Sequence, residues 1–115
     1  MNDEIKKWLQ DILDSINSIN DYIGTPRLFE QYEQNKLLRR AVEREIEIIG
    51  EAVNRINKQK PDLVTSNAKQ IIATRNRVAH PNDAVNNSII WGIAINHLPD
   101  LKIEISELLL GSNNN

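Results

Sequence analysis

The densest run of chemically capable side chains in the chain lies at residues 74–83, which read Thr-Arg-Asn-Arg-Val-Ala-His-Pro-Asn-Asp. The imidazole of His80 could take the proton of a ribose 2′-hydroxyl when neutral, or protonate a leaving 5′-oxygen when charged. The guanidinium of Arg75 could stabilise the charge of the transition state through paired hydrogen bonds. Asn76 could add a positioning hydrogen bond. These residue types favour cleavage of an RNA phosphodiester, with no metal ion or cofactor required.

The spacing of Arg75 and His80 does not by itself bring the two side chains together. On an unbroken helix they would lie about 7.5 Å apart along the axis and about 140° apart around it. His80 precedes Pro81, a position that disfavours helix, so a helix that ends early would let the imidazole turn back. Alternatively, a second copy of the chain could bring its own Arg and His to the same cleft across a two-fold axis. The dimer would also supply two imidazoles, one as acid and one as base. An Arg and a His at this spacing also occur by chance, with structural roles only.

Charge is distributed unevenly along the chain. The net charge of −2 argues against a strongly basic nucleic-acid-binding protein. Residues 36–80, however, hold ten basic and five acidic side chains, whereas the remainder holds four basic and eleven acidic ones. Helices of this segment that pack together would present a basic strip able to hold an RNA backbone, with Arg77 as a substrate-binding residue. The alternative is an ordinary solvated surface. The low aromatic content, 4%, indicates that RNA contacts would be mainly to phosphate.

The segments that must position these residues have the periodicity of helices. From Ile5 to Ile23, apolar residues recur at steps of three and four, which is typical of one buried helix face. Asn2 or Asp3 could cap the start of this helix, and Gly24 could end it.

Two further helices are predicted before the middle of the chain. Thr25 and Pro26 have the types expected of an N-cap and a first helical residue, opening a short helix or turn through Phe29 and Tyr32. A long helix is predicted over residues 36–58. Its small residues, among them Gly50, would let a neighbouring helix approach closely.

The second half of the chain predicts three more helical segments. One carries Ile71, Ile72 and Val78, with Thr65, Ser66 or Asn67 as its cap. Another covers residues 85–97, and Pro99 is expected to break or restart it before an apolar face continues to Leu109. The expected fold is all-α: an up-and-down bundle of four to five helices, in a single domain over residues 1–110 with a disordered tail at 111–115.

Composition excludes several classes of protein. The absence of Cys excludes disulfides and thiolate metal sites. The acidic N-terminus does not resemble a secretory leader, and the most apolar stretch, residues 89–95, is too short to cross a bilayer. We therefore expect a soluble, cytoplasmic protein with no membrane partner.

Several blocks of the sequence resemble one family. Residues 75–80 resemble the R-x(4–6)-H motif of the HEPN superfamily, in which a polar residue, here Asn76, typically follows the Arg. Residues 41–44 and 48–52 resemble a second block of the family, and residues 90–91 and 97–101 resemble its closing helix. Together the blocks are most similar to the HepT-like toxin family.

The resemblance implies an all-α bundle that forms a homodimer, with the motifs of both protomers lining one cleft. It implies a metal-independent endoribonuclease that acts as the toxin of a type VII toxin–antitoxin pair. The partner would be a minimal nucleotidyltransferase antitoxin. By this resemblance Arg75, Asn76 and His80 take the catalytic positions, and Glu51 matches a recurring acid of the family.

One position departs from the family pattern. In many relatives the motif continues as His-x-Tyr, and the antitoxin attaches AMP to that Tyr, whereas this chain has Asn82, which lacks a hydroxyl. An antitoxin could instead occlude the cleft or modify another hydroxyl, or this member could be regulated differently. The departure also leaves open a degenerate member without nuclease activity.

Two alternatives to a nuclease stay open. One is a non-catalytic helical dimer that binds a nucleotidyltransferase partner. The other is a nucleotide-binding protein that holds phosphates with Arg75 and Arg77. Of the remaining distinctive residues, His97 is expected to be structural, and Trp8 and Trp91 are expected in the core or at a dimer interface.

Overall fold

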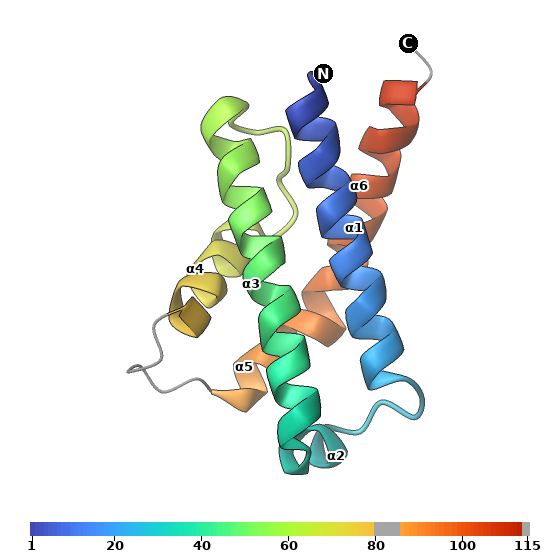
Figure 1. Ribbon diagram of the computed structural model, residues 1–115, viewed down its shortest axis with the longest axis vertical. Coiled ribbons are helices and arrows are strands. Elements are labelled where there is room, and N and C mark those ends of the chain that lie inside the picture. Colours follow the sequence, from blue (N-terminus) through green and yellow to red (C-terminus); the bar gives the residue numbers. More distant parts are fainter. Residues whose placement is uncertain (80–85, 114–115) are drawn as a thin grey trace.

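The computed structural model describes residues 1–79 and 86–113. These residues form helices without any β-strand, so the predicted all-α class is confirmed (Figure 1). The elements are α1 (Asp3–Ile23), α2 (Phe29–Gln34), α3 (Lys36–Gln59), α4 (Ala68–Ala79), α5 (Asn87–Gly92), the π-helical turn η1 (Ile93–His97) and α6 (Leu98–Asn113).

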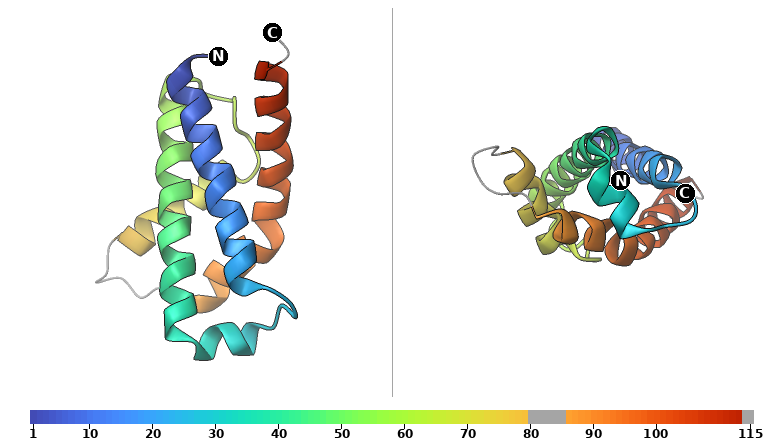
Figure 2. Two further views of the ribbon diagram at one scale, coloured as in Figure 1. Left: turned by 45° about the vertical axis from the view of Figure 1, so that its right-hand side comes forward. Right: turned by 90° about the horizontal axis from the view of Figure 1, so that it is seen from below.

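The long helices form an up-and-down bundle. Helices α1 and α3 pack side by side in opposite directions, α4 crosses the other side of α3, and α6 packs against α1 (Figures 1 and 2). The start of α1 and the end of α6 lie at the same end of the bundle (Figure 2). Helix α3 thus lies between α1 and α4, and α4 carries the Arg-Asn pair that the sequence singled out.

The core consists of the apolar stripes that the periodicity predicted. Isoleucines dominate it, and α1 and α3 contribute most of its members. The fully buried side chains include Ile5, Leu9, Ile12, Ile16, Ile19, Val42, Ile46, Ile49, Val53, Ile56, Ile71, Leu101 and Ile105. Burial of these faces against one another is the main source of the bundle's stability.

Local capping explains where the long helices begin and end. The Asn2 side chain accepts a hydrogen bond from the Ile5 N–H at 2.8 Å, and Gly24 follows α1 with φ of +62°. At α3, the Asn35 side chain accepts from the Leu38 N–H at 3.0 Å. The predictions for the ends of α1 and for the 36–58 helix are confirmed to within one or two residues.

The predicted start of the second helix is wrong. Helix α2 begins at Phe29, three residues after Pro26, and Leu28 precedes it without a side-chain cap. Arg27 donates from Nη2 to Asn20 Oδ1 at 3.0 Å, which holds the connector along α1. The packing of Phe29 against the Trp91 ring, with centroids 6.0 Å apart, fixes the start of α2 where local sequence signals did not.

Of the two outcomes predicted at Pro99, a break or a restart, the structure shows a restart: α6 begins at Leu98, directly after η1. The chain stays helical because η1 widens the turn before α6, and the Leu98 N–H bonds back to the Ile93 carbonyl five residues earlier. A widened turn accommodates the proline ring, which has no N–H to donate. Among described residues, the helix expected over 85–97 is α5 followed by η1, and Asn86 caps it through its side chain.

Helix α6 continues to Asn113, beyond the domain end expected at residue 110. Within residues 1–79 and 86–113, no helix combines the length and apolarity needed to cross a membrane.

Candidate functional site

Helices α3 and α4 approach each other closely at Gly50. A Cβ atom placed on Gly50 would lie 2.1 Å from Cβ of Arg75 and 2.6 Å from its Cγ. The backbone carbonyl of Ile71 would be 3.3 Å away. Only glycine leaves room for the Arg75 stem on the α3 backbone, so the expected close approach at Gly50 is confirmed and its partner is Arg75.

The guanidinium of Arg75 is held by two neighbours. Its Nη2 donates to Oε2 of Glu51, the residue after Gly50, and its Nη1 donates to Oδ1 of Asn76 at 2.9 Å. The side chain is 27% exposed, and its buried Nε has no acceptor among the described residues. The Arg75 side chain is therefore held against α3 rather than extended into solvent.

Glu51 joins Arg75 to a second guanidinium. Its Oε1 accepts from Nε of Arg55, one helical turn further along α3, at 3.0 Å. One carboxylate thus faces two cations, and the group keeps a surplus positive charge. Hydrogen bonds between a guanidinium and a phosphate are stronger than those between neutral groups. The surplus positive charge therefore favours an anionic ligand.

These residues line a cleft between α1, α3 and α4 with a volume of about 390 Å³. Further charged pairs occupy its rim: Lys7 with Asp11 at 3.1 Å, and Arg44 with Glu47 at 3.7 Å. The other lining residues are Trp8, Ile48 and Ala52. Four basic and three acidic side chains line the cleft, which leaves a surplus of one positive charge. Three of the four basic residues, Arg44, Arg55 and Arg75, come from the basic segment 36–80.

Of the residues predicted to act in catalysis, the structure brings two together. Arg75 and Asn76 are hydrogen-bonded neighbours on α4. Arg77 lies in the same helix, but its side chain is outside the described part of the chain. His80 and Asn82 also lie outside the described residues, so the geometry between Arg75 and His80 stays a prediction.

The structure adds roles that sequence reasoning missed. The contact between Glu51 and Arg75 joins residues 24 positions apart and follows from the crossing of two helices. A partial signal was present, because Glu51 and Arg55 stand at the spacing of a helical ion pair. Lys7 and Trp8 come from α1, and nothing in their local sequence relates them to Arg75.

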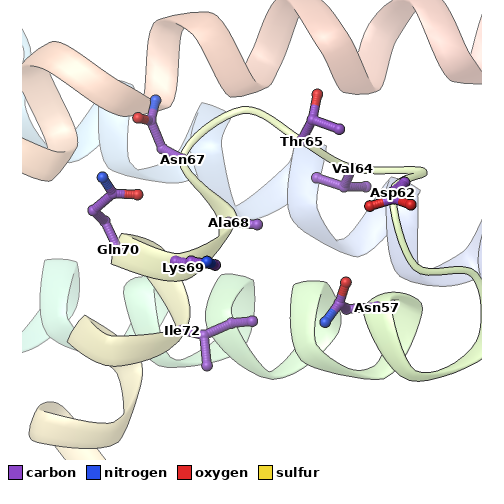
Figure 3. A pocket seen from close by; sticks show the side chains of 9 residues that line it. All are labelled: Asn57, Asp62, Val64, Thr65, Asn67, Ala68, Lys69, Gln70 and Ile72. Carbon is purple, nitrogen blue, oxygen red and sulfur yellow. The ribbon is translucent and has the colours of Figure 1, made fainter.

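Two other cavities contain none of the predicted catalytic residues. One, of about 490 Å³, lies between the connector after α3 and the first turn of α4, with Asn57, Thr65 and Lys69 among its walls (Figure 3). His97 lines another, of about 380 Å³, next to Thr74. In the described ranges, no three His, Asp or Glu side chains are grouped as metal ligands would be.

Known proteins resemble the chain along most of its length. Two proteins of Methanocaldococcus jannaschii are similar: "Putative RNase MJ0127", 30% identical over 92% of this chain and 88% of its own, and "Putative RNase MJ1380", 29% identical over 89% and 94%. "Putative RNase TTE0752" of Caldanaerobacter subterraneus is 33% identical over 70% of this chain and 73% of its own. No solved structure matches significantly.

The model of one protein family, described as ribonuclease HepT-like, matches residues 12–108. That range contains α2 to α5 entirely and includes the Gly50, Glu51, Arg75 and Asn76 cluster. The chain therefore belongs to the ribonuclease HepT-like family.

Proposed function

We propose that this protein is a metal-independent endoribonuclease and the toxin of a type VII toxin–antitoxin pair. Membership of a ribonuclease family supports the reaction class, and the similar proteins named as RNases agree with it. The observation that carries the proposal is the guanidinium of Arg75, which Glu51 and Asn76 hold by hydrogen bonds in a cleft with a surplus of one positive charge.

In the proposed reaction, the ribose 2′-oxygen attacks the adjacent phosphorus and the bond to the 5′-oxygen breaks. The products are a 2′,3′-cyclic phosphate and a free 5′-hydroxyl. Arg75 stabilises the charge that develops on the non-bridging oxygens, because its guanidinium group is already oriented when the substrate binds. Asn76 orients this guanidinium, and Arg77 on the same helix binds a neighbouring phosphate.

His80 completes the proposed site by moving protons. A neutral imidazole takes the proton of the 2′-hydroxyl, and an imidazolium gives a proton to the leaving 5′-oxygen. One His cannot hold both states in one step, so we assign the two roles to His80 of two protomers. The site would then form at the interface of a homodimer, with one Arg-His set from each copy.

The proposed antitoxin is a minimal nucleotidyltransferase. Because Asn82 stands where many relatives carry a Tyr, AMP transfer to that position is excluded by chemistry: a carboxamide has no hydroxyl. We propose that the partner neutralises the toxin by covering the cleft beside Arg75. A helical dimer that binds this partner without cutting RNA is the competing outcome of the test below.

The test is a nuclease assay on purified protein without antitoxin, in the presence of EDTA, with end-labelled RNA. We expect the wild type to cut and to leave cyclic phosphate ends. His80→Ala and Arg75→Ala should each lower the rate at least a hundredfold, within the range for loss of a general acid–base or a charge-stabilising group.

Lys58→Gln serves as the control, because Lys58 is exposed on α3 and does not line the cleft. It should cut at the wild-type rate, and circular dichroism should give the same helix content for every variant. The same alanine variants should relieve growth arrest on expression. A folded wild type that leaves RNA intact and cells growing would overturn the nuclease and favour the non-catalytic dimer.

A further inference from the structure

The cleft beside Arg75 contains side chains that the proposed reaction does not use. Lys7 and Trp8 reach it from α1, and Arg44 and Arg55 reach it from α3. All four line the same cavity of about 390 Å³ as Arg75. The surroundings of the proposed catalytic Arg therefore offer an aromatic ring together with positive charge, the two features by which proteins hold single-stranded nucleic acid.

The two tryptophans of the chain have different surroundings. Trp91 packs in an aromatic cluster, with its ring centroid 6.0 Å from Phe29 and 5.3 Å from Tyr32. Trp8 is half-buried: it packs against the core and also lines the cleft. Core packing accounts for Trp91, whereas the indole of Trp8 also provides an apolar surface inside a charged cleft.

The cations of the cleft are available to a phosphate. The Arg44 and Arg55 side chains are 68% and 55% exposed, and each has its acidic partner on the same exposed face of α3. Ion pairs this exposed contribute little to stability, so an incoming phosphate can replace the carboxylate at small cost. Glu51 bonds Arg55 through Oε1 and Arg75 through Oε2, so a phosphate that takes up Arg55 can leave the contact between Glu51 and Arg75 in place.

We propose that this cleft is the subsite for single-stranded RNA next to the scissile phosphate. A base stacks on Trp8, flanking phosphates contact Arg44 and Arg55, and the strand then leads to Arg75. The proposal rests on the proposed nuclease and adds the residues that bind its substrate. It revises the expectation that Trp8 is only a core or interface residue.

Binding can be measured apart from cleavage with a labelled 2′-O-methyl oligoribonucleotide. Such a strand has no free 2′-hydroxyl and cannot react, so the wild-type protein can be used. By fluorescence anisotropy, we expect Trp8→Leu to raise the Kd about tenfold, since it keeps apolar packing but removes the stacking face. In Trp91→Phe, Trp8 is the single tryptophan, and its emission should be quenched as the oligonucleotide binds.

The cationic part of the proposal has its own measurement. Arg44→Gln should weaken binding and lower the slope of log Kd against log salt by about 0.7, the value expected for one lost contact to a single strand. Lys58→Gln removes the same charge from the same helix outside the cleft and should leave the slope unchanged. Arg44 contacts neither Glu51 nor Arg75 in the described hydrogen bonds, so the catalytic group is left intact.

The outcomes separate this proposal from the nuclease itself. The subsite would be overturned if the wild type cleaves RNA but Trp8→Leu and Arg44→Gln bind the oligonucleotide as tightly as the wild type does. The proposed nuclease activity would not be affected by that result. Trp8 emission unchanged by a bound strand would also overturn it. A wild type that neither binds the strand nor cleaves RNA would overturn both.

Discussion

At the scale of single residues, Glu51 gives the site its geometry. It lies beside the Gly50 contact, accepts from Arg75 and Arg55, and has no proton-transfer role in the proposed reaction. It is therefore a positioning residue for Arg75. Asn76 supports the same guanidinium from its other side.

This role predicts a particular kinetic change in Glu51→Gln. The amide keeps the shape of the side chain but loses the charge that orients Arg75, so kcat should fall roughly tenfold. KM should not rise, because a negative charge has been removed from an RNA-binding cleft. Steady-state kinetics on a short RNA measures both constants.

Glu47→Gln is the matched control for this prediction. It removes an equal charge from the same cleft, but Glu47 pairs with Arg44 at 3.7 Å and does not contact Arg75. We expect its kcat to equal that of the wild type. A fall in kcat of equal size in both variants would show that cleft charge matters and that Arg75 positioning does not.

Residue types in the sequence are enough to propose Arg75 and Asn76 as catalytic residues, because few side chains can stabilise a phosphorane-like transition state without a metal. They were not enough to explain Glu51. Its partner lies 24 positions away on another helix, and only the crossing angle of α3 and α4 decides that the two meet. The place of Trp8 in the cleft depends on tertiary packing in the same way.

At the scale of elements, helices defined by long apolar stripes were predictable, and the boundaries of short ones were less so. Periodicity located α1 and α3; the Asn35 cap of α3 was not predicted. Helix α2 has only six residues, and its start follows from the packing of Phe29 on Trp91 rather than from Pro26. At Pro99 the π-helical turn η1 keeps the chain helical, a device that apolar spacing does not reveal.

One carboxylate links the C-terminal helix to the helix that carries the site. Glu104 on α6 accepts hydrogen bonds from the N–H groups of Thr65 and Ser66 and, at 2.7 Å, from the Thr65 hydroxyl, just before α4 begins. Partial burial would raise the pKa of Glu104, but the hydrogen bonds from Ser66 and Thr65 outweigh it and lower the pKa. The charged form is therefore favoured in the folded protein.

The lowered pKa of Glu104 predicts a contribution to stability that depends on pH. Because the folded pKa of Glu104 lies below its ordinary value of 4.5, the contribution is complete above pH 4.5 and is lost as pH falls through the folded pKa. Glu104→Gln should lower the free energy of unfolding by about 1 kcal/mol at pH 7, the usual scale for a lost cap. Near pH 3 the difference from the wild type should shrink.

Urea denaturation at both pH values measures this difference. Glu107→Gln is the control, because Glu107 is exposed on the same helix and makes no side-chain hydrogen bond in the described set. It should change stability little at either pH. An effect of Glu104→Gln that stays constant from pH 7 to pH 3 would contradict a role for the charged carboxylate.

At the scale of the whole molecule, net charge is a poor guide to the partner. The value of −2 conceals a cleft where α3 and α4 bring arginines together, each beside an acidic residue. The uneven distribution along the chain was visible in the sequence. The way the three helices converge on one cleft was not, because it depends on how the bundle closes.

The proposed need for two His80 side chains makes the dimer the unit of activity. In a heterodimer of one wild-type and one His80→Ala subunit, the cleft would hold both Arg75 guanidinium groups but only one imidazole. It would lack either the acid or the base of the reaction. The heterodimer should therefore have nearly the activity of the His80→Ala homodimer, far below half of the wild-type rate.

Co-expression of the two subunits with different affinity tags, followed by purification over both, isolates that heterodimer for the nuclease assay. A wild-type subunit paired with a Lys58→Gln subunit, purified in the same way, should cut at the full rate, because Lys58 lies outside the cleft. Half activity in the His80→Ala heterodimer would mean that each subunit carries a complete site. Nearly complete loss requires that one cleft be shared by two copies, which the symmetry of a two-fold dimer provides.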